Sequence, residues 1–251
     1  MLFRSHANLK DIKSPDECKV EYDMILEDLA RKQHDLEVSL LSKLFDDYQG
    51  NFKKLAEIAT LERGASYKTS DYSEDETGIP FLTLKSVSRD ATYSAGGLKW
   101  VKKDFSAASI AKTNDLFIAN TDLTPGRLLV GAPFYFPGVG SQHNPIYSMD
   151  LSKISSSHEY LSNEYIYLAL KTLRARKYMV MNTRGSTVGH LDIKSVLKFE
   201  VPEFSLPEWN LVREKTTVLL KTLESIRSEK SALQLLSVQL KNRILDPKNE
   251  L

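Results

Sequence analysis

The stretch Asn-Asp-Leu-Phe-Ile-Ala-Asn-Thr-Asp-Leu-Thr, residues 114–124, runs from a turn through an apolar segment into a polar loop. Asn114-Asp115 is a turn pair, and Leu116–Ala119 carries no polar side chain. A short apolar run bounded by turn residues is typical of a strand in the interior of a sheet. The polar residues that follow, Asn120-Thr121-Asp122, are therefore expected at the end of a buried strand.

Further short strands are predicted on both sides of this stretch. They are Ile79–Leu84, Arg127–Val130, Phe134–Phe136 and Leu197–Val201. One internal helix is expected from Ser162 to about Met181. Residues 51–205 are therefore predicted to form a mixed α/β (α+β) globular domain. A segment of this size buries roughly two-thirds of its unfolded surface, which is enough to fold as one domain.

A long amphipathic helix is predicted at each end of this domain. Ser14-Pro15-Asp16-Glu17 has the residues of a helix start, and Ser205-Leu206-Pro207-Glu208 repeats them. Apolar positions then recur at alternating four- and three-residue steps, with a few polar interruptions. These positions are Tyr22, Leu26, Leu29, Gln33, Leu36 and Leu40 in the first helix, and Leu219, Leu223, Ile226, Lys230, Leu233, Ser237, Leu240 and Ile244 in the second. A spacing that averages 3.5 residues favours an antiparallel coiled coil over two helices packed on the domain.

The predicted organisation has five parts. An N-terminal extension (1–15) precedes the first long helix (16–50), and the globular domain (51–205) is followed by the second long helix (206–246) and a tail (247–251). The first 50 residues are net acidic, the domain is mildly basic, and the remainder is close to neutral. This modest asymmetry suggests parts with different partners.

Composition excludes several classes of protein. The chain has 251 residues, of which 27% are charged and 41% hydrophobic, as in a globular protein and unlike a disordered one. Cys18 is the only cysteine, which excludes an internal disulfide and a multi-cysteine zinc site and favours a cytoplasmic location. The chain opens with no signal-peptide pattern. The uncharged stretch from Leu128 to Met149 contains several Pro and Gly residues, so no membrane helix is expected.

The sequence offers little for catalysis. It lacks the glycine-rich phosphate and dinucleotide motifs and the metalloprotease and hydrolase motifs, and its five histidines are scattered. No catalytic or metal-binding residue is therefore predicted. Asn144-Pro145-Ile146-Tyr147 comes close to the Asn-Pro-Pro-Tyr/Phe motif of amino-methyltransferases, but Ile146 replaces a proline and no methyl-donor loop precedes it. We interpret it as the edge of a strand, and an adenine-specific methyltransferase fragment stays open as an alternative.

Three polar loops near strand ends are better candidates for function. Hydroxyl groups, glycine backbone and basic side chains are suited to phosphate and base-edge contacts in duplex DNA. The predicted helix ending near Met181 also places three basic residues at three-residue steps on one face, where they could contact phosphates. The candidate DNA contacts are Ser66, Tyr67, Lys68, Asn120, Thr121, Arg127, Lys171, Arg174, Lys177, Arg184, Gly185, Ser186 and Thr187.

The order of these motifs resembles the target recognition domain of the specificity (S) subunit of Type I restriction–modification systems. The resemblance runs from about Phe52 to Pro202 and extends into both flanking helices. Its anchors are Leu55–Gly64, Gly78–Phe81, Asp115–Asp122 and Gly185–Thr187. A full-length specificity subunit has two such domains joined by antiparallel helices, whereas this chain has one. It is therefore expected to be a half-subunit or one half of a longer protein.

The resemblance implies a non-catalytic role in sequence-specific recognition of double-stranded DNA. The chain would position methyltransferase (M) and restriction (R) subunits, with the long helices as a spacer. S-adenosylmethionine, ATP and magnesium would bind to those partners and not to this chain. The resemblance also implies a homodimer or pairing with a second half-subunit through the helices. A coiled-coil scaffold that binds protein is the remaining alternative.

Overall fold

The computed structural model describes residues 15–73, 78–88, 92–102, 105, 109–124, 126–140 and 144–245. The chain divides into two compact units, which we treat separately. The globular unit is Val38–Glu214, and the helical unit combines Met1–Glu37 with Lys215–Leu251. Among the described residues, no helix is long and apolar enough to cross a membrane.

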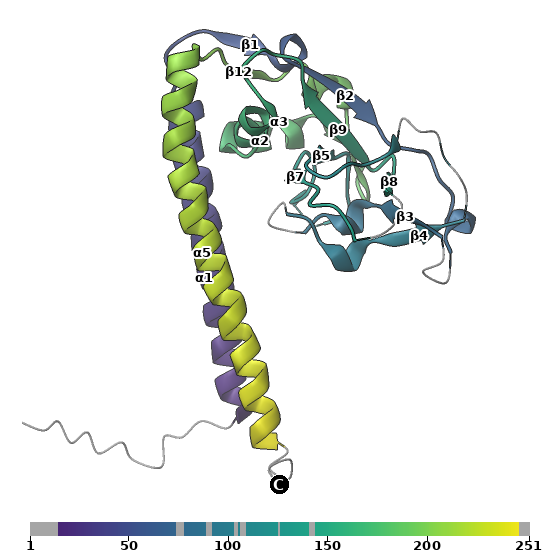
Figure 1. Cartoon of the computed structure of the whole chain (residues 1–251), viewed down its shortest axis with the longest axis vertical. Coiled ribbons are helices and arrows are strands. Elements are labelled where there is room, and N and C mark those ends of the chain that lie inside the picture. Colours follow the sequence, from purple (N-terminus) through teal and green to yellow (C-terminus); the bar gives the residue numbers. More distant parts are fainter. Residues whose placement is uncertain are drawn as a thin grey trace, which may run out of the picture. The chain divides into compact units, whose positions relative to one another are not determined.

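A four-stranded antiparallel sheet forms the centre of the globular unit (Figure 1). Its strand order is β2 (Ala59–Arg63), β9 (Leu151–Ser156), β5 (Leu116–Ala119) and β7 (Pro133–Tyr135). The predicted interior strand is confirmed, because all four residues of β5 are buried. On β5, Phe117 stacks on Phe134 with ring centroids 5.6 Å apart and meets the edge of Tyr147 at 4.9 Å. These rings belong to the main hydrophobic core.

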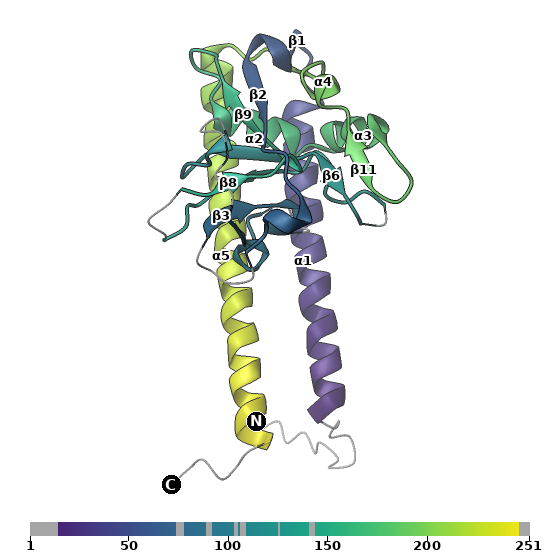
Figure 2. The same ribbon diagram turned by 90° about the vertical axis from the view of Figure 1, so that its right-hand side faces the viewer.

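Three smaller sheets surround this centre. β3 (Ile79–Leu82) pairs with β4 (Lys99–Val101) and, in parallel, with β8 (Ile146–Tyr147). β11 (Gly189–Leu191) lies between β10 (Thr183–Arg184) and β6 (Thr121–Asp122) (Figure 2). β1 (Phe52–Lys54) pairs with β12 (Glu200–Pro202). The short helices are the 3-10 turns η2 (Leu55–Glu57), η3 (Thr69–Asp71), η4 (Leu84–Ser86) and η5 (Ala95–Gly97), and the α-helix α4 (Ile193–Val196).

The predicted internal helix is two helices and not one. α2 (Asn163–Leu170) contacts β9 and β7, and α3 (Leu173–Met181) follows after a break. Thr172 causes the break, since its hydroxyl oxygen accepts a hydrogen bond from the Ala175 amide and so caps a new helix. Residues before and after Thr172 therefore do not share one helical face.

The predicted strand Arg127–Val130 is also wrong, because this segment is a loop. Arg127 has φ of 58°, in the left-handed region, which ends any extended conformation. The amides of Leu129 and Val130 donate to the side chain of Asp122, at 2.6 and 2.9 Å, instead of to a neighbouring strand. The predicted strand Leu197–Val201 begins later than expected, with β12 at Glu200.

The two long helices are α1 (Pro15–Phe45) and α5 (Leu206–Leu245). The residues of these helices that belong to the helical unit run in opposite directions (Figures 1 and 2). Most side chains of the predicted seam, from Leu26 to Gln33 and from Leu219 to Ile244, lie outside the described residues. The cap at Ser14 lies outside them too. Pairing as a coiled coil therefore stays a prediction.

Near its C-terminal end, α1 leaves two positions of the predicted seam exposed, while Leu41, which widens the predicted apolar stripe, is buried. Leu36 and Leu40 are 50% and 36% exposed, whereas Leu41 and Phe45 are buried. The reason is a cluster of aromatic rings within the globular unit: Phe45 meets Tyr165 at 5.7 Å and Phe204 at 5.6 Å. Trp209 of α5 packs on the other side of Tyr165, at 5.2 Å. This cluster fixes one end of each long helix to the globular unit.

Candidate nucleic-acid interface

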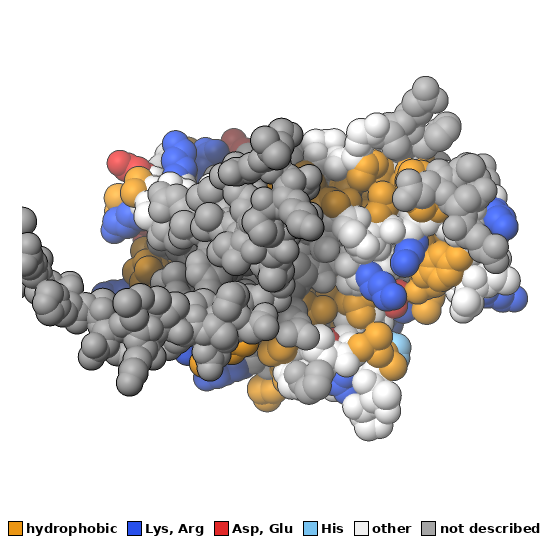
Figure 3. All heavy atoms as spheres, turned by 90° about the horizontal axis from the view of Figure 1, so that it is seen from below, with side chains coloured by type: hydrophobic (Ala, Val, Ile, Leu, Met, Phe, Trp, Pro, Cys, Tyr) orange, Lys and Arg blue, Asp and Glu red, His pale blue; other side chains and the backbone are white. Residues whose placement is uncertain are grey.

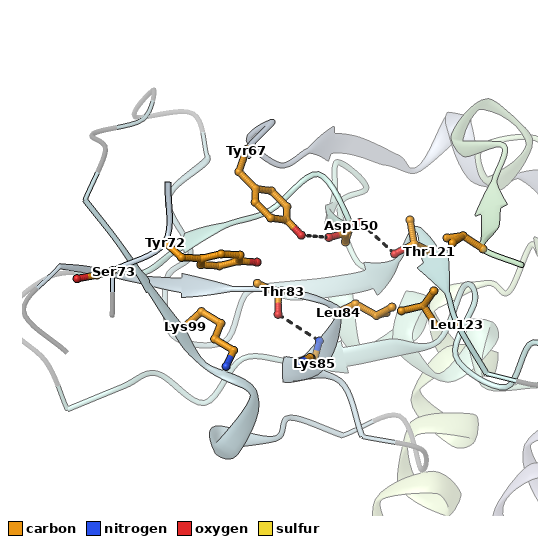
Figure 4. Close-up of a pocket in the computed structure, with 11 residues that line it drawn as sticks. Tyr67, Tyr72, Ser73, Thr83, Leu84, Lys85, Lys99, Thr121, Leu123 and Asp150 are labelled. Atoms are coloured by element: carbon orange, nitrogen blue, oxygen red, sulfur yellow. Dashed lines mark hydrogen bonds between the residues drawn. The ribbon is translucent and has the colours of Figure 1, made fainter. Parts of the chain in front are cut away.

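A cavity of about 590 Å³ opens in the globular unit between the β3–β4 region and the strand β6 (Figure 4). Its lining combines hydroxyl, ammonium, carboxylate and apolar groups from parts of the chain far apart in sequence. The lining residues are Tyr67, Tyr72, Ser73, Thr83, Leu84, Lys85, Lys99, Thr121, Leu123, Asp150 and Val188. Two of them, Tyr67 and Thr121, are among the predicted DNA contacts.

Asp150 organises one wall of the cavity. Its carboxylate accepts hydrogen bonds from the hydroxyls of Tyr67 (2.9 Å), Thr121 (3.1 Å) and Ser148 (3.3 Å). Its position is fixed by the main chain as well, because the Asp150 carbonyl accepts from the amide of Asn120 at 2.7 Å. We call Tyr67, Thr121 and Asp150 the acceptor wall.

Tyr67 is held by its ring as well as by its hydroxyl. The ring packs edge-on against Tyr72 at 5.5 Å and against Phe81 at 5.2 Å. Burial raises the pKa of the Tyr67 hydroxyl well above its usual range, and interactions with Tyr72 and Asp150 add to this rise. The hydroxyl therefore stays protonated and donates its proton to Asp150.

Two lysines lie on the opposite side of the cavity. Lys85 belongs to η4 and Lys99 to β4, and both side chains are exposed. Neither ammonium group has an ion-pair partner among the described residues. Figure 3 shows the end of the globular unit that carries β3 and β4: Lys and Arg side chains lie there among apolar and neutral polar ones, and few Asp or Glu side chains are visible. Such a surface suits a polyanionic ligand.

A buried carboxylate shapes the loop next to the cavity. Asp122 is fully buried and accepts hydrogen bonds from the amide and hydroxyl of Thr124, each at 2.6 Å, and from the two amides of the loop at Leu129 and Val130. Burial alone would raise the pKa of Asp122, but the hydrogen bonds from Thr124, Leu129 and Val130 hold it below its usual value.

Arg127 connects this loop to the predicted DNA-contact loop Gly185–Thr187. Its guanidinium donates to the carbonyl oxygens of Asp122 (2.9 Å), Gly185 (2.6 Å) and Ser186 (2.7 Å). Gly189 leaves room for it, because a Cβ there would lie 2.9 Å from the Arg127 side chain and displace it. The structure therefore places Arg127 as a group that positions the loop.

The predicted basic helix face does not form. Lys171 precedes the break at Thr172, is 4% exposed, and donates from Nζ to the Tyr167 hydroxyl at 3.1 Å. Arg174 interacts with Asp46 and with the Glu200 carbonyl. Of the three expected phosphate contacts, Lys177 is exposed, whereas Lys171 is buried and Arg174 is partly exposed with its guanidinium in these contacts.

The predicted DNA contacts in the loops also include both buried and exposed residues. Asn120 is 2% exposed and donates from Nδ2 to the Met149 carbonyl, so it is not placed to contact a base. Ser66, Lys68, Arg184 and residues 185–187 are exposed. Their assignment as DNA contacts stays a prediction.

Sequence reasoning missed Asp150 and the two cavity lysines. Asp150 lies 83 residues from Tyr67 and 29 from Thr121, so no local pattern announces their contact. Among the described residues, no three His, Cys, Asp or Glu side chains gather as metal ligands would. The side chains that hydrogen-bond to the Asp150 carboxylate in the described part of the chain do so through hydroxyl groups.

No protein-family model matches the sequence, and no curated protein matches it either. Solved structures do match. One, described as the structural basis of complex assembly and conformational transition of the type I R-M system, has a TM-score of 0.58 and 14% identity over 92% of this chain and 56% of its own. The HsdS subunit from Thermoanaerobacter tengcongensis has a TM-score of 0.51 and 13% identity, over 90% of this chain and 54% of its own. The S subunit of the Type I restriction–modification system of M. genitalium has a TM-score of 0.53 and 16% identity, over 90% of this chain and 58% of its own.

This chain has the fold of a Type I specificity subunit. The resemblance seen in the sequence motifs is thus confirmed for the fold. The likeness covers 90% or more of the chain in all three cases. The chain spans a little over half the length of the solved structures it matches. In this specificity-subunit fold, the cavity and the Asp122–Arg127 loop both belong to the globular unit.

Proposed function

We propose that this chain is a DNA-recognition subunit of a Type I restriction–modification complex. It binds a specific double-stranded sequence and positions methyltransferase and restriction subunits on that site, in the cytoplasm. The chain performs no chemistry itself, and S-adenosylmethionine, ATP and magnesium bind to the partner subunits. The observation that carries this proposal is the likeness of fold to specificity subunits over more than nine-tenths of the chain in the first match.

The chemistry of the cavity supports the proposal. Its lysines offer donors for phosphates or for guanine, and its acceptor wall offers hydrogen-bond acceptors for base edges. A cavity that offers both donors and acceptors suits the edges of base pairs, since each pair presents its own pattern in the major groove.

The length of the chain leads to the second part of the proposal. Because it covers just over half of the specificity subunits it resembles, a second recognition domain is needed to read a two-part site. A second copy of the chain, a second half-subunit, or the other half of a longer protein supplies that domain, with α1 and α5 joining the two. The helices then act as the spacer between the two domains.

The position of Tyr147 argues against the alternative of a methyltransferase fragment. In that motif the aromatic residue stacks on a flipped base and must reach the active-site pocket. Here Tyr147 is 0% exposed, lies in β8 and packs against Phe117. Ile146 is buried in the same strand. The segment therefore serves the hydrophobic core.

The test is selection of binding sites from a random pool of duplex DNA by the full-length chain, alone and with its methyltransferase subunit. We expect enrichment of one sequence, and retention that weakens as salt rises from about 50 to about 200 mM. Failure to enrich any sequence would contradict the recognition role and favour the protein-binding scaffold. Binding of S-adenosylmethionine by the isolated chain, measured by calorimetry, would favour the methyltransferase fragment.

A further inference from the structure

Two hydroxyl groups on the cavity wall have their protons committed to a single carboxylate. The Tyr67 hydroxyl donates to one oxygen of Asp150 and the Thr121 hydroxyl to the other, at 2.9 and 3.1 Å. An ionised carboxylate has no proton to give, so both hydroxyls must point their protons at it. What they still offer to a ligand in the cavity is lone pairs only.

The surroundings hold the oxygen atoms of the two hydroxyls in place, and the hydrogen bonds to Asp150 orient their protons. The Tyr67 ring is fixed between Tyr72 and Phe81, and Thr121 is 4% exposed within β6. Ser148, fully buried, donates a third hydrogen bond to Asp150 at 3.3 Å. Turning either proton away would remove one hydrogen bond from the carboxylate, and for Thr121 it would remove the side-chain donor to Oδ1, which is costly.

The opposite side of the cavity has the reverse polarity. The ammonium groups of Lys85 and Lys99 can only donate (Figure 4). A ligand group that approaches the acceptor wall must therefore carry a donor, while phosphates or other acceptors are directed toward the lysines. The exposed Leu123 stands beside Thr121 in the lining and offers no hydrogen bond.

We propose that the acceptor wall selects a base carrying an exocyclic amino group, adenine or cytosine, at one position of the recognised DNA sequence. In the major groove adenine presents its N6 amino group and cytosine its N4 amino group as donors, whereas guanine O6 and thymine O4 are acceptors. A keto oxygen would meet lone pairs of Tyr67 and Thr121 and be rejected. This inference rests on the proposed DNA-recognition function and adds which base class the cavity reads.

The test compares site selection by the wild-type chain with that of two variants. Tyr67→Phe removes one hydroxyl and keeps the ring contacts with Tyr72 and Phe81. We expect its preference for adenine or cytosine to fall about tenfold at one position and to be unchanged elsewhere. Asp150→Asn introduces an amide donor, which lets a hydroxyl proton turn toward the cavity. We expect this variant to accept guanine or thymine at that same position.

Tyr160→Phe is the matched control. Its hydroxyl donates to the Phe204 carbonyl at 3.2 Å, away from the cavity lining. It removes the same chemical group and should leave every base preference intact. Thermal melting of each variant establishes that it is folded, and Tyr67→Phe alone still decides the question if Asp150→Asn does not fold.

The outcomes separate this inference from the function on which it rests. A wild-type chain that selects no sequence overturns the recognition function, and the inference falls with it. A wild-type chain that selects a sequence while Tyr67→Phe keeps all its preferences overturns only the inference. The inference is also overturned if Tyr67→Phe changes the base preference equally at every position of the site. It is overturned as well if this variant loses a preference for guanine or thymine.

Discussion

Arg127 and Gly185 lie 58 residues apart, and the guanidinium of Arg127 donates to the Gly185 carbonyl at 2.6 Å. Both residues have positive φ angles, 58° for Arg127 and 101° for Gly185. The same guanidinium nitrogen also donates to Ser186 at 2.7 Å. The segment at Arg127, which the sequence predicted as a strand, and the predicted DNA-contact loop at Gly185 are therefore held together by one side chain.

Replacing Arg127 separates a positioning role from a phosphate-binding role. Arg127→Lys keeps the positive charge but loses the planar fork that reaches several carbonyls at once. We expect Arg127→Lys and Arg127→Met each to lower the free energy of unfolding by about 1–3 kcal/mol, since carbonyls lose their partners. Amide hydrogen exchange of residues 185–191 should accelerate in both. If Arg127→Lys shows the amide exchange and DNA affinity of the wild type, the positioning role is contradicted. That result would indicate that Arg127 contacts DNA through its charge.

Asp122 predicts how stability depends on pH. Its pKa is lower in the folded chain than the usual value of an aspartate in an unfolded chain, so the ionised carboxylate stabilises the fold above that usual value. This contribution is lost as the pH falls through the lowered folded pKa. We therefore expect the free energy of unfolding, measured with urea, to fall as the solution is acidified below about pH 4.

Asp122→Asn should remove this part of the acid dependence. At neutral pH it should also cost about 3 kcal/mol, because asparagine has only one acceptor oxygen, so its NH2 group must face either the two donors of Thr124 or the amides of Leu129 and Val130. Asp47→Asn, at an exposed position, makes the same change of charge and serves as the control. Equal acid dependence in Asp122→Asn and the wild type would show that other groups govern it.

The elements that the sequence predicted well are those whose signals are local. The apolar run at Leu116–Ala119 and the signals for a long helix at each end depend on neighbouring residues, and the strand and both helices are present in the structure. The break at Thr172 was missed because the apolar positions continue across it and only the cap marks a new helix. The spacing of Lys171, Arg174 and Lys177 consequently predicted a face that does not exist.

The candidate site depends on contacts that no local pattern encodes. Tyr67 and Thr121 were predicted because hydroxyl groups in loops suit DNA, but their shared partner Asp150 comes from a third segment. Asn120 was predicted on the same grounds as Thr121, yet it points into the core. Asn120 lies between β5 and β6, and sequence alone does not say which side chains of such a connection face the ligand.

Lys171 offers a direct test of the corrected helix geometry. Its ammonium group lies over the Tyr167 ring, 5.1 Å from the centroid, and is buried. We expect Lys171→Met, which keeps most of the side-chain volume, to leave DNA affinity and its dependence on salt unchanged, as measured by fluorescence anisotropy. A reduced dependence on salt would mean that Lys171 reaches a phosphate after all.

Replacing Lys85 and Lys99, in contrast to Lys171, should weaken DNA binding and reduce its dependence on salt. Both ammonium groups are exposed at the cavity, and each phosphate neutralised by a lysine contributes about −0.9 to the slope of log affinity against log salt. The double variant Lys85→Gln/Lys99→Gln should therefore bind all duplexes more weakly and with a slope smaller by about 1–2. Lys198→Gln, an exposed lysine outside the cavity lining, is the control for the loss of one positive charge. If the double variant loses affinity only for the selected sequence and keeps the full slope, the lysines read bases and the phosphates are held elsewhere.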